Sequence, residues 1–378
     1  MGGTENRGLL AESLTDPVRP SAEDQVRFLL NVQRLLGEGS FVATYKFALL
    51  HALADLALSE GDDTATEMVL ETSKIAERMV ELYWPQAAEH VGGAHIHSLA
   101  AAGSGAQTIR QILQNSGRQA EIIGHITRAS DAGSLGRVRR DARVWKRLVA
   151  DVDVTLRKMP LWKLQTIGGD AVEFLYANDP AKSARTIQLR SGVAYCLRAY
   201  HGLVTELARG AWLRFVRRQN PGLEQGAVDL ASFLFGRERG SLDVFRAPLR
   251  EVQSGGCFYC HRPLAADAGH VDHFIPWARY AADIPHNFVL AHGSCNGRKS
   301  DFLASEAHLE RWVVRNDVHA DVFADVAGRE LFERSSSRAA GVARWAYGQT
   351  EASRLRVWLG GKDFEHLSGA WRQLLSAS

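Results

Sequence analysis

The chain has 378 residues, of which 46% are hydrophobic and 23% charged, and its formal net charge is +2. This composition is typical of a globular protein and excludes a disordered or collagen-like chain, and the length favours two domains or slightly more. The nearly balanced charge excludes a polycation that binds nucleic acid over its whole surface, so any nucleic-acid surface has to be local.

The sequence shows no membrane or export signal. No stretch reaches about 18 consecutive apolar residues, which a membrane span would need. The first twenty residues lack a basic stretch followed by an apolar core, so they are expected to form a flexible tail rather than a secretory signal. We therefore expect a cytoplasmic protein without a membrane partner.

Helical patterns fill most of the first 250 residues. Ser21 can cap the first helix, in which Leu29 and Leu36 recur at helical spacing. Further helices are predicted over 41–59, before Pro85, and over 187–219. From Phe302 onward helical patterns return, with four tryptophans as expected apolar anchors: Trp312, Trp345, Trp358 and Trp371.

Two basic clusters lie in the first helical region. They contain Arg137, Arg139 and Arg140, and Arg214, Arg217 and Arg218. Such clusters are typical of solvated helix faces, and near a helix C-terminus they complement the helix dipole. The alternative is contact with nucleic-acid phosphates, which gains weight only if a nuclease lies nearby.

Three of the four cysteines lie close together, which favours metal ligation in a reducing compartment over disulfides. A C-x-x-C pair and an H-x-x-C pair supply Cys257, Cys260, His292 and Cys295. Together they would form a closed Cys3His shell for a structural Zn2+. The alternative is free cysteines and a surface histidine, and the nearby His261 and His270 leave the fourth ligand the least certain.

Polar residues with a recognisable spacing lie between and after these pairs. Two short strands are expected over 271–275 and 287–290, and a helix after the last cysteine. The first strand carries an Asp-His pair followed by a proline, the second begins with an asparagine, and a further asparagine follows Cys295.

This arrangement resembles an HNH endonuclease of the ββα-metal (His-Me finger) class, in its zinc-containing form. The resemblance covers about residues 257–301. The sequence departs from the usual pattern at His292, where the family has the first cysteine of the second pair. That change keeps zinc ligation possible and alters the charge of the site by one unit.

The resemblance implies a role for each polar residue. His273 would be the general base, Asn287 would bond the backbone of the loop carrying His273, and Asp272 and Asn296 would hold one catalytic Mg2+ or Mn2+. Arg298 and Lys299 would contact phosphates, or else form ordinary helix-surface charge. Neighbours in a regular strand point to opposite sides, so Asp272 and His273 can share a centre only if the strand bulges or ends there.

The predicted fold is mainly α with a small α+β insert: a ββα-metal HNH module held together by a structural zinc and flanked by α-helical regions. The expected ranges are a tail (1–20), an α-helical region (21–250), the HNH module (251–305) and a C-terminal helical region (306–378). The predicted function is metal-dependent cleavage of DNA, with RNA not excluded, in the setting of restriction or phage defence. The alternative is an inactive HNH fold that acts as a DNA-binding or assembly protein. A regulatory protein partner or a homo-oligomer is left open.

Overall fold

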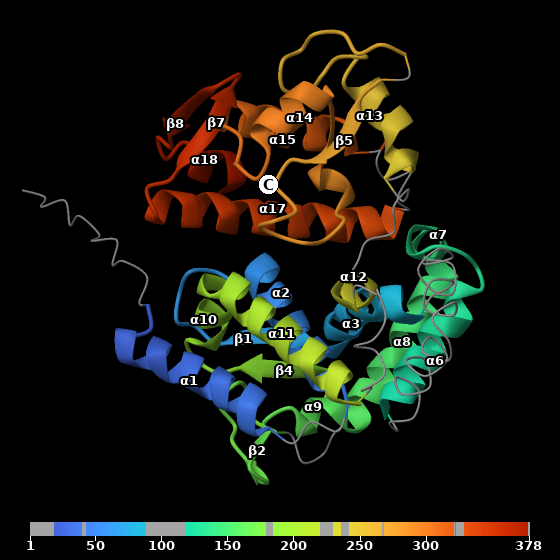
Figure 1. Ribbon diagram of the computed structural model, residues 1–378, viewed down its shortest axis with the longest axis vertical. Coiled ribbons are helices and arrows are strands. Elements are labelled where there is room, and N and C mark those ends of the chain that lie inside the picture. Colours follow the sequence, from blue (N-terminus) through green and yellow to red (C-terminus); the bar gives the residue numbers. More distant parts are fainter. Residues whose placement is uncertain are drawn as a thin grey trace, which may run out of the picture.

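The computed structural model describes residues 19–39, 43–87, 118–178, 184–219, 230–235, 242–266, 268–320, 322 and 329–376. Nearly all of the predicted tail lies outside these ranges. The described residues form two halves, one above the other in Figure 1, each with its own hydrophobic core. The first core is built from residues between 28 and 234, and the second from residues between 249 and 375 together with Leu58.

The first half is a group of helices around α2 (Tyr45–Glu60), in which every residue except Glu60 is buried. A helix that is buried on all sides belongs at the centre of a core. α1 (Ala22–Glu38) lies at the edge of this half, and the Ser21 hydroxyl accepts a bond from the Asp24 amide, as the sequence predicted. The other elements are β1 (Met68–Glu71), α3 (Thr72–Ala87), α6 (Arg118–Ser130), α7 (Leu135–Arg140), α8 (Ala142–Lys158), α9 (Pro160–Lys163), β2 (Thr166–Ile167), β3 (Asp170–Ala171), β4 (Thr186–Leu189), α10 (Val193–Ala199), α11 (His201–Gln219) and α12 (Leu230–Phe235).

For two helices of this half, the sequence predicted one boundary wrongly. α3 continues through Pro85 to Ala87, because the proline lies in the last turn and the packing of the buried Trp84 and Ala87 offsets its lost hydrogen bond. The segment predicted to begin a helix at residue 187 is strand β4, paired antiparallel with β1. Helical structure starts only after Gly192, whose φ of +77° is a left-handed conformation that glycine adopts readily.

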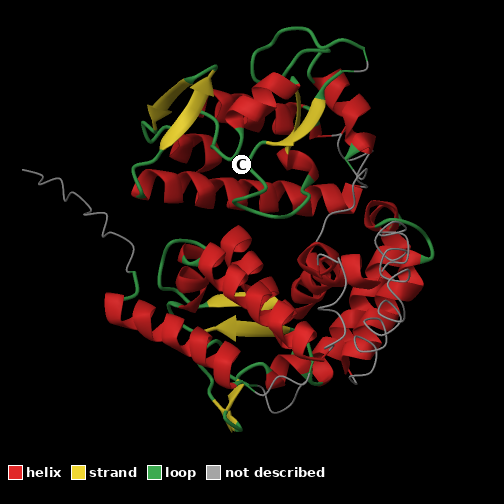
Figure 2. Ribbon diagram, viewed as in Figure 1, coloured by secondary structure: helices red, strands yellow, loops and turns green. Residues whose placement is uncertain are grey.

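The second half contains the two strands and the helix that the sequence predicted. β5 (His270–His273) pairs antiparallel with β6 (Phe288–Ala291), and α14 (Gly293–Lys299) follows. The remaining elements are η3 (Asp243–Phe245), α13 (Arg246–Val252), η4 (Pro285–Asn287), α15 (Glu306–Val318), α17 (Arg329–Ala352), β7 (Arg356–Gly360), β8 (Asp363–His366) and α18 (Trp371–Ser376). Figure 2 shows the predicted fold class, mainly helical with small two-stranded sheets.

The helices after residue 305 share one core with the ββα unit. Trp312 of α15 stacks on Phe274 with 5.2 Å between ring centroids, and Trp358 packs edge-on against Tyr259 at 5.2 Å. Trp358 lies on strand β7, not on a helix as predicted. The residues expected to form an HNH module and a separate C-terminal region therefore pack as one unit.

The two halves meet where α17 crosses the end of α2. A Cβ at Gly341 would lie 1.9 Å from the carbonyl oxygen of Ser59, so only glycine permits this approach. Nearby, the Trp345 indole donates to the carbonyl oxygen of Arg198 at 2.9 Å. None of the helices in the described ranges is both long enough and apolar enough to cross a membrane.

Candidate active site and metal centre

Four candidate zinc ligands come together beside the ββα unit. The donor atoms of Cys257, Cys260, His292 and Cys295 all lie within 4.8 Å of one another. His292 faces the group through Nδ1, which is 3.3 Å from the Cys260 sulfur. Three thiolates and one imidazole complete a tetrahedral shell and leave no position for a substrate, so these residues fit a structural zinc.

Hydrogen bonds to the surrounding backbone orient these ligands. His292 Nε2 lies 3.2 Å from the carbonyl oxygen of Pro263, which favours a proton on Nε2 and leaves Nδ1 free for the metal. The Cys257 amide donates to the carbonyl oxygen of Arg262 at 3.0 Å, closing the turn that brings Cys260 back toward Cys257. Within the described ranges, His261 and His270 are not part of the group.

His273 is the last residue of β5 and is held on several sides. Its Nε2 lies 2.9 Å from Asp283 Oδ1, and its ring packs edge-on against Trp277 and Phe288, with centroids 5.2 and 5.0 Å away. Its side chain is 7% exposed. The structure shows no hydrogen bond from Nδ1 to any residue that it describes. The imidazole is thus fixed in orientation, and its Nδ1 has no hydrogen bond to a described residue.

Asp283 was missed by sequence reasoning. It lies ten residues after His273, in a segment without a periodic pattern. The available signal was a carboxylate shortly after a candidate catalytic histidine, but such a spacing does not by itself predict a contact.

Asp272 has a different set of partners from those of His273. Its Oδ2 accepts a hydrogen bond from the Tyr259 hydroxyl at 2.6 Å and lies 3.3 Å from the Lys299 ammonium. Burial, reinforced by the charge of Asp272, holds the pKa of Tyr259 well above its ordinary value, so this phenol remains a donor. Oδ1 makes no hydrogen bond to a described residue.

Asn287 fixes the backbone that follows His273. Its Oδ1 accepts from the Ile275 amide at 2.7 Å, and its Nδ2 donates to the Ile275 carbonyl at 2.9 Å. Its own carbonyl accepts from the Phe274 amide at 2.7 Å. Asn287 thus bonds the backbone two residues after His273 through both atoms of its side-chain amide.

Asn296 lies one turn before Lys299 on α14 and is partly exposed. Residues three apart lie on the same helix face, so Asn296 is on the face that Lys299 presents to Asp272. Its side-chain amide forms no hydrogen bond with the described part of the chain. Asp272 and Asn296 each retain a hard oxygen atom, a donor type that suits Mg2+ or Mn2+.

The structure separates the predicted nucleic-acid contacts into two kinds. Six of the arginines are exposed: Arg298, Arg137, Arg140, Arg214, Arg217 and Arg218. Arg139 instead pairs with the buried Glu81 and lies over the Trp145 ring. Lys299 is fully buried, donates to the carbonyl oxygen of His273 at 2.9 Å, and has its pKa lowered by burial against the opposing effect of Asp272. In this structure neither Arg139 nor Lys299 is free for the predicted phosphate contact, since both are used internally.

The two strands, the helix and the Cys3His group define an HNH endonuclease module. Residues 257–302 match the family model described as HNH endonuclease. Residues 25–230 match the model described as Domain of unknown function (DUF8808), and the chain belongs to this family. No curated protein and no solved structure matches the chain. The module indicates a nuclease-type function with a nucleic-acid substrate, and residues 25–230 are called the family domain below.

Proposed function

We propose that this protein is a metal-dependent HNH endonuclease that hydrolyses phosphodiester bonds in DNA, by nicking or double-strand cleavage. The observation that carries the proposal is the fixed imidazole of His273 with its uncommitted Nδ1. A neutral imidazole of this kind can take the proton of an attacking water. The HNH family match over residues 257–302 supports the same reading.

The other residues supply position and charge. Asp272 and Asn296 would hold a Mg2+ or Mn2+, which would neutralise charge on the phosphate and on the leaving oxygen. Asn287 keeps the backbone after His273 in place through Ile275. Arg298 is exposed on the same helix as Asn296 and is suited to contact a flanking phosphate.

The test is cleavage of supercoiled plasmid with Mg2+, with Mn2+ and with EDTA. His273→Ala should lower the cleavage rate by roughly 10²- to 10⁴-fold, the contribution typical of a general base, without loss of zinc or of folded structure. His366→Ala, an exposed histidine of β8, is the matched control and should cut like the unaltered protein. Unchanged cutting by His273→Ala would remove this residue from the mechanism. Binding of DNA without cutting under any metal would favour the inactive binding protein instead.

The biological setting that we propose is restriction or phage defence in the cytoplasm. Its support is the size of the family domain, residues 25–230, which offers a large surface for recognising a ligand, a partner or the DNA itself. Cleavage of methylated, unmethylated and phage DNA in parallel tests this setting. Equal cutting of all three would argue against it.

A further inference from the structure

The segment between β5 and η4, residues 274–284, contacts both His273 and the family domain. Near its end, the Asp283 carboxylate contacts the imidazole of His273. In its middle, the Tyr280 side chain is 1% exposed and contacts residues of α17 and of the family domain. We call this segment the positioning loop.

The contact between Asp283 and His273 selects one tautomer. A carboxylate only accepts hydrogen bonds, so at 2.9 Å the proton of the imidazole belongs on Nε2. Nδ1 then carries the lone pair that can take a proton from water. Asp283 also places a negative charge beside the ring, where it stabilises the imidazolium formed after that transfer.

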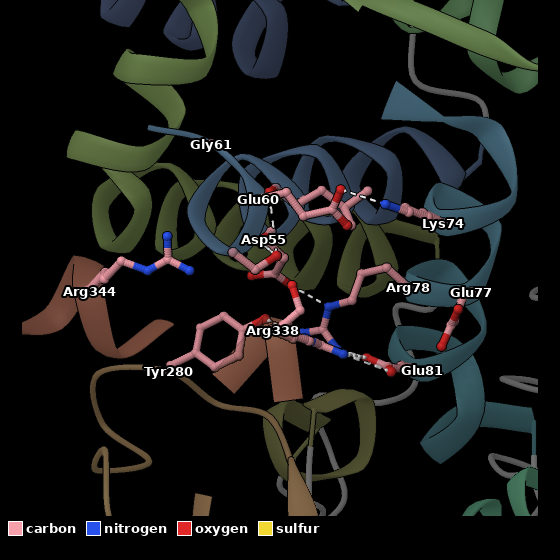
Figure 3. A pocket seen from close by; sticks show the side chains of 13 residues that line it. Asp55, Glu60, Gly61, Lys74, Glu77, Arg78, Glu81, Tyr280, Arg338 and Arg344 are labelled. Carbon is pink, nitrogen blue, oxygen red and sulfur yellow. Dashed lines mark hydrogen bonds and ion pairs between the residues drawn. The ribbon is translucent and has the colours of Figure 1, made fainter. Parts of the chain in front are cut away.

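The contact at Tyr280 ties the loop to the family domain. The Arg338 guanidinium of α17 donates to the Tyr280 hydroxyl at 2.9 and 3.1 Å, and also donates to both carboxylate oxygens of Glu81 on α3, at 3.0 and 3.2 Å. The His201 ring of α11 lies 5.8 Å from the Tyr280 ring, measured between centroids. Figure 3 shows Tyr280, Arg338 and Glu81 meeting at the wall of a cavity of about 290 Å³.

The ion pair behind Tyr280 is largely shielded from solvent, with the Glu81 side chain 8% and the Arg338 side chain 22% exposed. Burial alone would raise the pKa of Glu81, but Arg338, Arg139 and Arg78 outweigh it and hold that pKa well below its ordinary value. A bidentate guanidinium–carboxylate pair of this kind fixes direction as well as distance. The family domain therefore offers a rigid support to the middle of the positioning loop.

We infer that Asp283 is a positioning residue for His273, and that the family domain holds it in place through Tyr280, Arg338 and Glu81. The inference rests on the proposed function for its catalytic consequence, but the contact itself can be tested without cleavage. Hydrolysis needs the Nε2–H tautomer, because only this form presents Nδ1 as a proton acceptor. The family domain would thus supply part of the nuclease geometry, and nuclease competence would depend on its docking.

The first experiment measures the tautomer directly, on the full chain with ¹⁵N-labelled histidine. Long-range ¹H–¹⁵N spectra report which imidazole nitrogen is protonated, and the His273 signals are those missing in His273→Gln. The unaltered protein should show the Nε2–H form, and Asp283→Glu should retain it. Asp283→Asn should lose the single tautomer, since an amide can donate as well as accept. An unchanged His273 spectrum in Asp283→Asn would overturn the inference, whether or not the protein cleaves DNA.

The second experiment measures cleavage kinetics and tests whether the contact between Tyr280 and Arg338 holds the positioning loop in place. Asp283→Asn should lower kcat by about 100-fold with KM within about twofold, and Asp283→Glu should recover most of the loss. Tyr280→Phe removes only the hydroxyl that Arg338 contacts and should lower kcat by about tenfold and broaden the His273 signals. Tyr176→Phe is the control, because it removes a buried hydroxyl bonded to the Leu161 carbonyl at 2.6 Å in the family domain. Tyr280→Phe with the spectrum and kcat of the Tyr176→Phe control would overturn the anchoring by the family domain.

Discussion

Replacing Lys299 with methionine would remove a buried positive charge from between β5 and α14. The Lys299 ammonium lies 3.3 Å from Asp272 and donates to the carbonyl oxygen of His273 at 2.9 Å. Methionine has a similar length and no charge, so the packing volume is largely kept while the charge and its hydrogen bond are lost. The substitution therefore separates an internal role for Lys299 from the phosphate contact that the sequence predicted.

The size of the effect follows from the short distance and the burial. At 3.3 Å and an effective dielectric constant of about 20, the attraction between the two charges is about 5 kcal/mol. Burial lowers the pKa of Lys299 in spite of this attraction, so desolvation outweighs it and the expected loss comes from the groups that the substitution leaves behind. Removing the lysine also takes its charge away from Asp272, which keeps the Tyr259 hydroxyl, and leaves the carbonyl oxygen of His273 without its ammonium donor. Losing one member of a buried pair typically costs about 3–5 kcal/mol in the free energy of unfolding, and we expect that range here.

Urea unfolding of the zinc-loaded protein, followed by circular dichroism, measures this loss. Arg298→Met is the matched control, because Arg298 is exposed on the same helix and its loss should change the free energy of unfolding by no more than about 0.5 kcal/mol. The reasoning is refuted if Lys299→Met unfolds at the same urea concentration as this control. In that case two further results for Lys299→Met would identify Lys299 as a phosphate contact. Its KM would be raised, and the salt dependence of its nucleic-acid binding would be weaker by about one phosphate contact.

Three further results are expected. His292→Ala should be purified without bound zinc while His292→Cys retains it, by atomic absorption, and full zinc in the alanine variant would exclude His292 as a ligand. Asn287→Ala leaves the amide and the carbonyl of the buried Ile275 unpaired and should cost about 2–4 kcal/mol in urea unfolding, and an unchanged midpoint would contradict this. Burial, with Arg315 and Arg311 nearby, lowers the pKa of His286 to about 3 and that of His308 to about 4. In the unfolded chain both histidines bind a proton near pH 6.5, whereas in the folded chain they stay neutral to a lower pH. Their contribution to the free energy of unfolding is therefore fully present above pH 6.5 and should fall by about 4 kcal/mol at pH 5. Equal unfolding midpoints at pH 5 and 7.5 would contradict this.

The ββα unit could be predicted because its signals are local. The cysteine pairs, the Asp-His pair and the two asparagines lie within one short stretch, and their spacing determines which of them lie on neighbouring strands and on the helix. Strand β4 could not be predicted in the same way. Its Thr186 and Ile187 favour extended structure only weakly on their own, and the strand is stabilised by β1, far earlier in the sequence. Trp358 likewise belongs to a hairpin, and its indole packs against Tyr259, which lies far from it in the sequence, so its neighbours along the chain did not predict its strand.

The sequence also could not predict which individual charged residues are buried. Arg139 lies between two exposed arginines on α7 and has the same local pattern as they do. What distinguishes it is Glu81, which approaches from α3. A charge cluster in a sequence therefore cannot say which member faces solvent, and this selection requires the tertiary structure.

The position of Glu81 bears on the predicted nucleic-acid contacts of α7. Its carboxylate pairs with Arg139 of α7, Arg78 of its own helix and Arg338 of α17, so one buried group joins both halves of the protein. An apolar interface tolerates sliding, whereas buried pairs of guanidinium and carboxylate groups lose most of their energy when they shift, because the charges are then left unpaired. The exposed Arg137 and Arg140 on α7 are thereby held in one orientation relative to the nuclease half. If they contact nucleic acid, they do so at a fixed position relative to His273, and the family domain helps to determine where along the bound strand cleavage falls.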